Sequence, residues 1–162
     1  MAIKYKKIMS FLFIAYILLL IELTLIGSVF GRRISFDAVF NWQILNENFR
    51  ELTNFTPFST IEPLIRSIRS GHEKSAIFIA NIVINIVLFM PFSIFLPYFF
   101  KKQRNILVFF LTISIINIVI EILQFVFSTG SCDIDDYILN ICGAMVVYLF
   151  PFFHYLHKKL KR

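Results

Sequence analysis

The chain has 162 residues, of which 58% are hydrophobic and only 16% charged, with 21 phenylalanines and a formal net charge of +6. A water-soluble domain of this length needs a more polar surface, so the composition excludes an ordinary soluble globular protein. The positive charge calls for no nucleic-acid partner, because lysines and arginines that flank membrane helices on the cytoplasmic side account for it.

The first predicted element is an apolar block at residues 8–30, interrupted by few polar residues, among them Glu22. The block is longer than the hydrophobic region of a secretory signal peptide, and no pair of small residues at cleavage-site spacing follows it. We therefore expect an uncleaved helix that crosses the membrane, because about 20 apolar residues span roughly 30 Å of hydrocarbon.

A long polar connection follows at residues 31–75, with six basic and five acidic residues. Its aromatic residues indicate that this 45-residue loop rests partly on the membrane interface. Arg32, Arg33 and Asn54 are candidate loop contacts to a ligand, and Arg66 and Arg69 could meet phosphate groups. The segment from Asn54 to Pro57 could either cover a pocket as a lid or serve as a plain head-group anchor.

Three further apolar blocks, at residues 76–100, 106–127 and 137–155, are each long enough to span a membrane. Pro91 predicts a kink in the second span, since proline removes a backbone hydrogen bond. The sequence thus predicts an all-α integral membrane protein, a single domain over residues 1–162. The expected fold is a four-helix bundle with an extracellular loop between the first and second helices.

Basic residues predict the orientation. They cluster in the N-terminal segment, in the connection between the second and third spans, and in the C-terminal tail, and four spans put all three on one side. By the positive-inside rule both termini are cytoplasmic and the long loop is external. Cys132 then lies outside, where a thiol reagent could reach it.

Polar residues within the spans fall at a common depth near the outer surface. Helical spacing puts Glu121 and Gln124 in one stripe of the third span, and Asp133, Asp136 and Asn140 on one face of the fourth. We expect these groups to face one another around an outward-facing polar pocket, because ionisable residues in membranes usually mark functional sites. Its predicted residues are Asn85, Glu121, Gln124, Asp133, Asp136 and Asn140.

Structural roles compete with this interpretation for several residues. Asn81 and Asn117 are expected to join helices by hydrogen bonds. Asp133 could cap the N-terminus of the fourth helix. Asp135 points away from the predicted face, and we expect it to be solvated.

Four motifs in order resemble the VanZ-like family: NFTPFSTI from Asn54, NIVLFMPFSIFLP from Asn85, EILQ from Glu121 and DIDDYILNICG from Asp133. Many members carry an arginine shortly before the first aspartate, where this chain has Ser131. The resemblance implies a multi-pass protein of the bacterial plasma membrane. It also implies a link to resistance against teicoplanin, an antibiotic that binds cell-wall precursors outside the membrane.

Three functions follow from this pattern. The leading one is binding of membrane lipids, of a lipid-linked cell-wall precursor or of a lipoglycopeptide, with a homo-oligomer left open. The second is an enzyme in which Glu121, Asp133 and Asp136 hold Mg²⁺ or Mn²⁺, with Glu121 and Asp136 as candidate catalytic residues. The third is a small proton-coupled transporter. Because the sequence has neither a Ser–His–Asp order nor a glycine-rich phosphate loop, it favours binding over catalysis.

Overall fold

The computed structural model describes residues 2–26, 41–51, 53–59, 65–66, 69 and 75–150. The chain begins with α1 (Ala2–Ile21), which continues as a π-helical segment, η1 (Glu22–Ile26). The remaining elements, in chain order, are α3 (Trp42–Glu51), β1 (Thr53–Asn54), α5 (Ser75–Phe89), α6 (Phe92–Phe99), η3 (Lys101–Arg104), α7 (Ile106–Val126), β2 (Cys132–Asp133) and α8 (Ile134–Leu149).

Three helical stretches of the described chain are long and apolar enough to cross a membrane: Tyr5–Ile26, Ile79–Phe99 and Ile106–Val126. They agree with the first three predicted spans, and the helical membrane character is confirmed. The prediction of a fourth span, at residues 137–155, is not confirmed. The helix α8 has 16 residues, or about 24 Å at 1.5 Å per residue, and residues 151–155 of the predicted span lie outside the described part.

The second span is broken, as Pro91 predicts. The helix α5 ends at Phe89, and α6 restarts after a turn at Met90 and Pro91. The break brings the start of α6 against α8, where the buried Ser93 hydroxyl donates to the carbonyl of Ala144 at 2.6 Å. The kink is therefore part of the packing of the bundle.

The most extensive helix contact joins α5 to α8. Gly143 on α8 makes it possible, because a Cβ at this position would lie 2.0 Å from the backbone oxygen of Ile86 on α5. No larger residue allows the two backbones to approach this closely.

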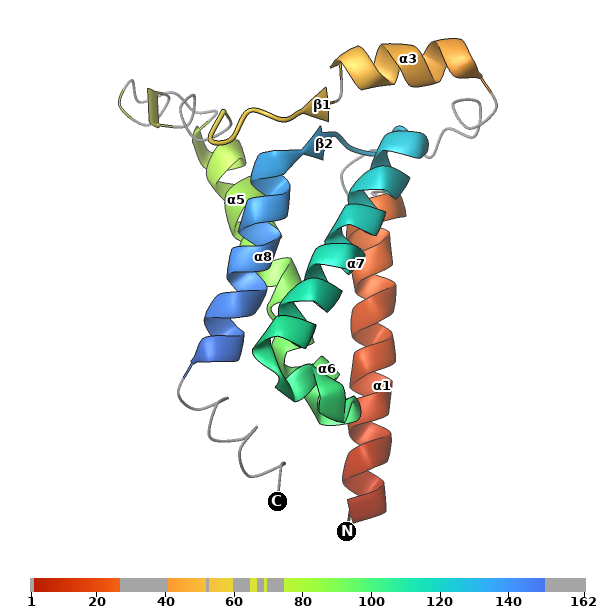
Figure 1. Cartoon of the computed structure of the whole chain (residues 1–162), viewed down its shortest axis with the longest axis vertical. Coiled ribbons are helices and arrows are strands. Elements are labelled where there is room, and N and C mark those ends of the chain that lie inside the picture. Colours follow the sequence, from red (N-terminus) through yellow and green to blue (C-terminus); the bar gives the residue numbers. More distant parts are fainter. Residues whose placement is uncertain are drawn as a thin grey trace.

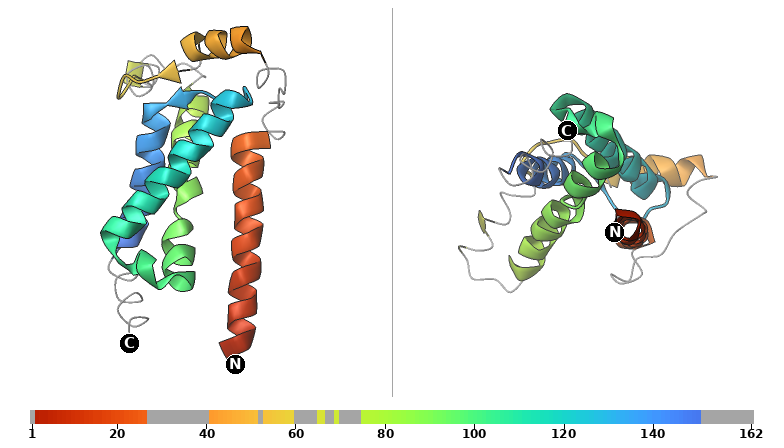
Figure 2. Two further views of the ribbon diagram at one scale, coloured as in Figure 1. Left: turned by 45° about the vertical axis from the view of Figure 1, so that its right-hand side comes forward. Right: turned by 90° about the horizontal axis from the view of Figure 1, so that it is seen from below.

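The first helix lies at the edge of the bundle, as Figure 2 shows. Most of its side chains are exposed, whereas Tyr16 and Leu20 are buried against the other helices. Tyr16 stacks on Phe95 of α6, and its hydroxyl donates to the carbonyl of Leu88 at 2.8 Å. A second contact of the first helix lies farther along the chain, where η1 packs against α7.

The predicted external loop contains regular structure, which corrects the purely helical prediction. The helix α3 lies across one end of the molecule, and β1 pairs in parallel with β2 through Thr53↔Cys132 and Asn54↔Asp133 (Figure 1). This pairing supplies partners for backbone groups that precede α8 and would otherwise lack them. We call this end of the molecule the α3 end.

Candidate functional site

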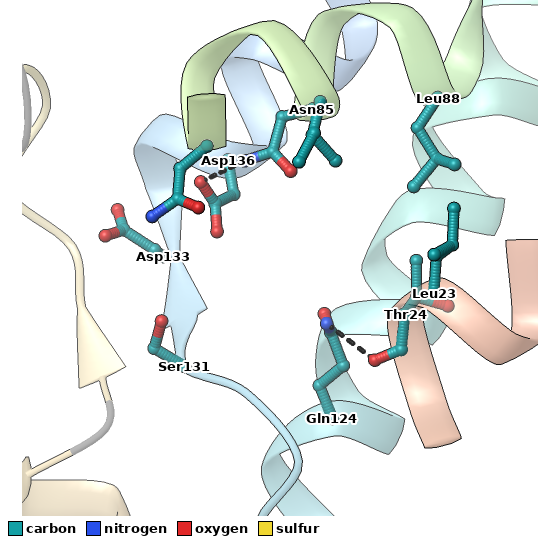
Figure 3. A pocket seen from close by; sticks show the side chains of 10 residues that line it. Leu23, Thr24, Asn85, Leu88, Gln124, Ser131, Asp133 and Asp136 are labelled. Atoms are coloured by element: carbon teal, nitrogen blue, oxygen red, sulfur yellow. Dashed lines mark hydrogen bonds between the residues drawn. The ribbon is translucent and has the colours of Figure 1, made fainter. Parts of the chain in front are cut away.

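A cavity of about 210 Å³ lies at the α3 end, between η1, α5, the end of α7 and the start of α8. Figure 3 shows that Leu23 and Leu88 lie on one side of it, whereas Asp133 and Asp136 lie on the other. The wall is thus polar toward α8 and partly apolar toward η1, where Leu23 lies beside Thr24. Its polar members are Thr24, Asn81, Asn85, Gln124, Ser131, Asp133 and Asp136, and its apolar members are Leu23, Ile84 and Leu88.

Asn85 and Asp136 form the polar pair between α5 and α8. The amide of Asn85 donates to a carboxylate oxygen of Asp136 (Figure 3). Both residues were predicted for the pocket, and both line the cavity. The close approach at Gly143 holds the two helices together below this pair.

Gln124 closes the cavity from the end of α7. Its amide donates to the backbone carbonyl of Thr24 at 3.0 Å, and the hydroxyl of Thr24 donates to Leu20 at 2.7 Å. The π-helical turn of η1 changes the i→i−4 pattern there, a deviation that recurs at functional sites. Gly130 leaves room for Gln124, since a Cβ there would lie 3.0 Å from the amide nitrogen of that side chain.

Asp133 combines the capping and cavity roles that the sequence suggested. Its carboxylate accepts from the backbone N–H of Asp135 at 2.9 Å, which is the expected N-cap of α8. The same oxygen accepts from the amide of Asn54 at 3.2 Å. Asn54, predicted as a loop contact, is therefore tied to the rim of the cavity.

Two predicted pocket residues lie behind the cavity wall. Glu121 is 5% exposed, and its carboxylate accepts from the backbone N–H of Asp133 at 3.3 Å. Asn140 is equally buried, and its amide donates to Asn117 at 2.9 Å, while Asn117 donates to the carbonyl of Tyr137 at 3.1 Å. Asn117 and Asn140 thus join α7 to α8, and Glu121 holds the turn that positions Asp133.

The expectation that Asp135 is solvated was wrong. Its side chain is 2% exposed and accepts from the backbone N–H of Phe58 at 2.5 Å. Phe58 has a φ of 66°, in the left-handed region that few residues other than glycine adopt. Residues 53–59, which we call the strap, therefore lie over the start of α8, fixed by β1, by Asn54 and by Phe58.

The predicted metal set is not assembled. Within the described ranges, no group of three His, Cys, Asp or Glu side chains could hold a metal ion. Glu121, Asp133 and Asp136 instead accept hydrogen bonds from different partners. The geometry of the described residues therefore does not support the alternative of a Mg²⁺ or Mn²⁺ site at these three carboxylates.

The four predicted arginine contacts fall into two pairs. Arg32 and Arg33 lie outside the described residues, and Arg66 and Arg69 have exposed side chains. Asn81 is also exposed, and it lines the cavity.

The thiol of Cys132 lies near acidic side chains at β2, and they affect its pKa. Partial burial raises the pKa of its thiol, and the negative charges of Glu121 and Asp133 raise it further. The other cysteine, Cys142, is exposed on α8. At neutral pH the Cys132 thiol is therefore more fully protonated than an ordinary cysteine.

Sequence reasoning missed three features of the site. Thr24 and Ser131 line the cavity, and Thr24 could have been found as a polar residue in an apolar block. Leu23 lines the cavity from η1, and no residue of the first span was among the predicted pocket residues. The contact of Asp135 with Phe58 joins positions 77 residues apart, which helical spacing cannot reveal.

Comparisons with known proteins agree on one family. A family profile described as VanZ/LLP1 matches residues 13–155. Protein VanZ of Enterococcus faecium is 33% identical over 81 residues, which are 48% of this chain and 50% of that protein. The chain thus spans about half the length of this curated relative. No solved structure matches the fold significantly.

Proposed function

The chain belongs to the VanZ/LLP1 family, and we propose that its cavity binds the polar part of a cell-envelope lipid or lipid-linked precursor in the bacterial plasma membrane. On this proposal the protein lowers susceptibility to glycopeptide or lipoglycopeptide antibiotics such as teicoplanin. The observation that carries the proposal is the wall of carboxylates and amides at one end of apolar helices, around Asn85 and Asp136.

The proposal includes a topology. The basic residues of η3 lie at the end opposite the cavity (Figure 1), and such residues mark the cytoplasmic side. The protein is then one domain with four spans, α8 being the fourth, with both termini cytoplasmic and the α3 end outside.

Cysteine labelling on intact cells tests this topology. In a Cys142→Ala background, a membrane-impermeant maleimide should label Cys132 in intact cells. When Cys132→Ser is added to that background, the variant Lys102→Cys should react only after the membrane is permeabilised. The reverse pattern would reject the proposed orientation.

The chemistry of the wall supports binding of a hydroxyl-bearing or amide-bearing head group. Carboxylates accept hydrogen bonds from such groups, and bonds to charged acceptors are stronger than neutral ones. The amides of Asn81 and Gln124 can both donate and accept. The apolar side of the cavity, at Leu23 and Leu88, suits the junction between a head group and its hydrocarbon.

Antibiotic susceptibility tests the function. Wild type and Asp136→Asn are expressed at matched membrane abundance in a teicoplanin-susceptible Gram-positive host, with Val146→Ala as the control. Val146 is 62% exposed on α8 and lies away from the cavity wall. Wild type and the control should raise the inhibitory concentration, whereas Asp136→Asn should not. Equal values for the empty host and wild type would reject the proposed effect on the envelope.

A further inference from the structure

A second, apolar hollow begins where the polar cavity ends. It has a volume of about 300 Å³ and lies between α1 and α5. Leu23, Ile84 and Leu88 line both spaces, so the polar cavity and the apolar groove share a wall. From the shared residues the groove extends along α1 as far as Tyr16, and along α5 to Pro91 in the turn that follows this helix.

The groove exists because α1 contacts its neighbours at separate points. Near the α3 end, Gln124 of α7 is bonded to Thr24. Farther along, Tyr16 packs on Phe92 and Phe95 of α6. Between these points Leu19 of α1 and Val83 and Val87 of α5 remain 50–53% exposed in the chain. The groove is thus bounded at both ends and open along its length.

The groove presents hydrocarbon alone. The hydroxyl of Tyr16 is occupied by its hydrogen bond to the carbonyl of Leu88, and the other residues of the wall have no polar side-chain atoms. From Tyr16 to Leu23 the groove follows seven residues of helix, or about 10 Å at 1.5 Å per residue. This length suits a segment of one hydrocarbon chain. A ligand without an apolar part would gain no hydrophobic stabilisation along such a wall.

We propose that the cavity and the groove form one site for an amphiphile, with a hydroxyl-rich head group such as a sugar in the cavity and a single hydrocarbon chain along the groove. This inference rests on the proposed function and specifies the class of lipid. The continuity of the two walls carries it. Leu23 and Leu88, which lie on one side of the cavity in Figure 3, also line the groove, so the polar and apolar parts of the site adjoin. The open side lets the ligand enter laterally from the membrane.

Photolabelling of the full chain in phosphatidylcholine vesicles tests the site. The probe is an alkyl glycoside with a diazirine in its chain, and a phosphocholine with the same photoreactive chain is the comparison. The glycoside should label Leu19, Val83 and Val87 preferentially, and an excess of unlabelled alkyl glycoside should remove this labelling. Labelling that is uniform over exposed positions such as Ile115 and Val146, or equal for the two probes, would overturn the proposal.

Two bulky variants from opposite walls test the groove itself. Val87→Trp and Leu19→Trp should each reduce the labelling severalfold, because the indole occupies the chain position. Val146→Trp, on an exposed part of α8, is the matched control and should label as wild type. Since all three positions are at least half exposed, the substitutions do not require the core to expand. Unchanged labelling in both groove variants would contradict the assignment.

Susceptibility measurements separate this inference from the proposed function. If Asp136→Asn abolishes the antibiotic effect while Val87→Trp and Leu19→Trp retain it, the cavity functions without the groove and the amphiphile site is wrong. If all three variants lose the effect and the Val146→Trp control keeps it, the extended site is supported. If all variants keep the effect, the proposed function fails first, and the groove assignment fails with it.

Discussion

At the scale of single residues, the site depends on acids that are held by specific partners. Asp133 caps α8 and contacts Asn54, Asp135 accepts from the strap, and Asp136 accepts from Asn85. Each carboxylate in this short turn therefore has a different structural environment. Aspartates that lie within four positions of one another therefore need not share a role.

The thiol of Cys132 provides a test of the charge at this turn. Its pKa is raised by burial and by the charges of Glu121 and Asp133, and only the thiolate reacts rapidly with maleimide. In a Cys142→Ala background, the rate should therefore rise with pH around a midpoint above that of an ordinary cysteine. Asp133→Asn should shift the midpoint down, because asparagine keeps the cap but removes the charge. A wild-type midpoint at or below the ordinary value would contradict this description.

The contact of Asp135 with Phe58 predicts that the strap loosens when the carboxylate is removed. A hydrogen bond to a charged group contributes about 1.5–3 kcal/mol. Asp135→Ala should therefore accelerate hydrogen exchange at the amides of residues 53–59, while the amides of α7 exchange as in wild type. Asp135→Asn, which keeps an acceptor oxygen, is the control and should have a smaller effect. Equal exchange in the strap of wild type and Asp135→Ala would show that this contact does not hold it.

At the scale of elements, the contact between α5 and α8 determines the shape of the cavity. Gly143 lets the two backbones meet, and the pair of Asn85 and Asp136 lies at the end of that contact. The break at Pro91 then directs α6 back against α8, where Ser93 bonds to Ala144. A polar cavity can persist at the α3 end because the packing below it is close.

Gly143→Ala should therefore destabilise the protein. The added Cβ would lie 2.0 Å from the oxygen of Ile86, so the helices must separate, and overpacking of this kind costs about 1–3 kcal/mol. The midpoint of unfolding in detergent should fall, and the neighbouring control Cys142→Ala, at an exposed position, should not change it. An unaltered midpoint for Gly143→Ala would mean that α5 and α8 are not held as closely as described.

The sequence predicted most of the long helices but missed specific contacts between elements. Apolar length identified three helices that are long enough to cross a membrane, and Pro91 identified the break, because both effects are local. The strap and the β1–β2 pairing were missed because they join segments that are 79 positions apart, where no periodicity links them. The burial of Glu121 behind the cavity wall and of Asp135 against the strap was also missed. Helical spacing gave the face of each residue but not the element packed against it.

At the scale of the whole molecule, polar and apolar surfaces are separated along the bundle. The strap and α3 lie at one end of the molecule (Figure 1). The cavity lies at the same end, and the apolar groove extends from it between α1 and α5. Leu23 of η1 lines both spaces, and α1 continues the groove as far as Tyr16. The arrangement suits a ligand that lies partly in the membrane.

The measurement that tests the central claim most directly is equilibrium binding of a fluorescent polyprenyl-linked cell-wall precursor to the full chain in nanodiscs. Wild type and Val146→Ala should bind it saturably and with equal affinity. Asp136→Asn should bind about tenfold to hundredfold more weakly, because it loses a charged hydrogen-bond acceptor. Binding of equal strength to wild type and Asp136→Asn, or no saturable binding to wild type, would contradict the proposal that the cavity holds the head group of an envelope lipid.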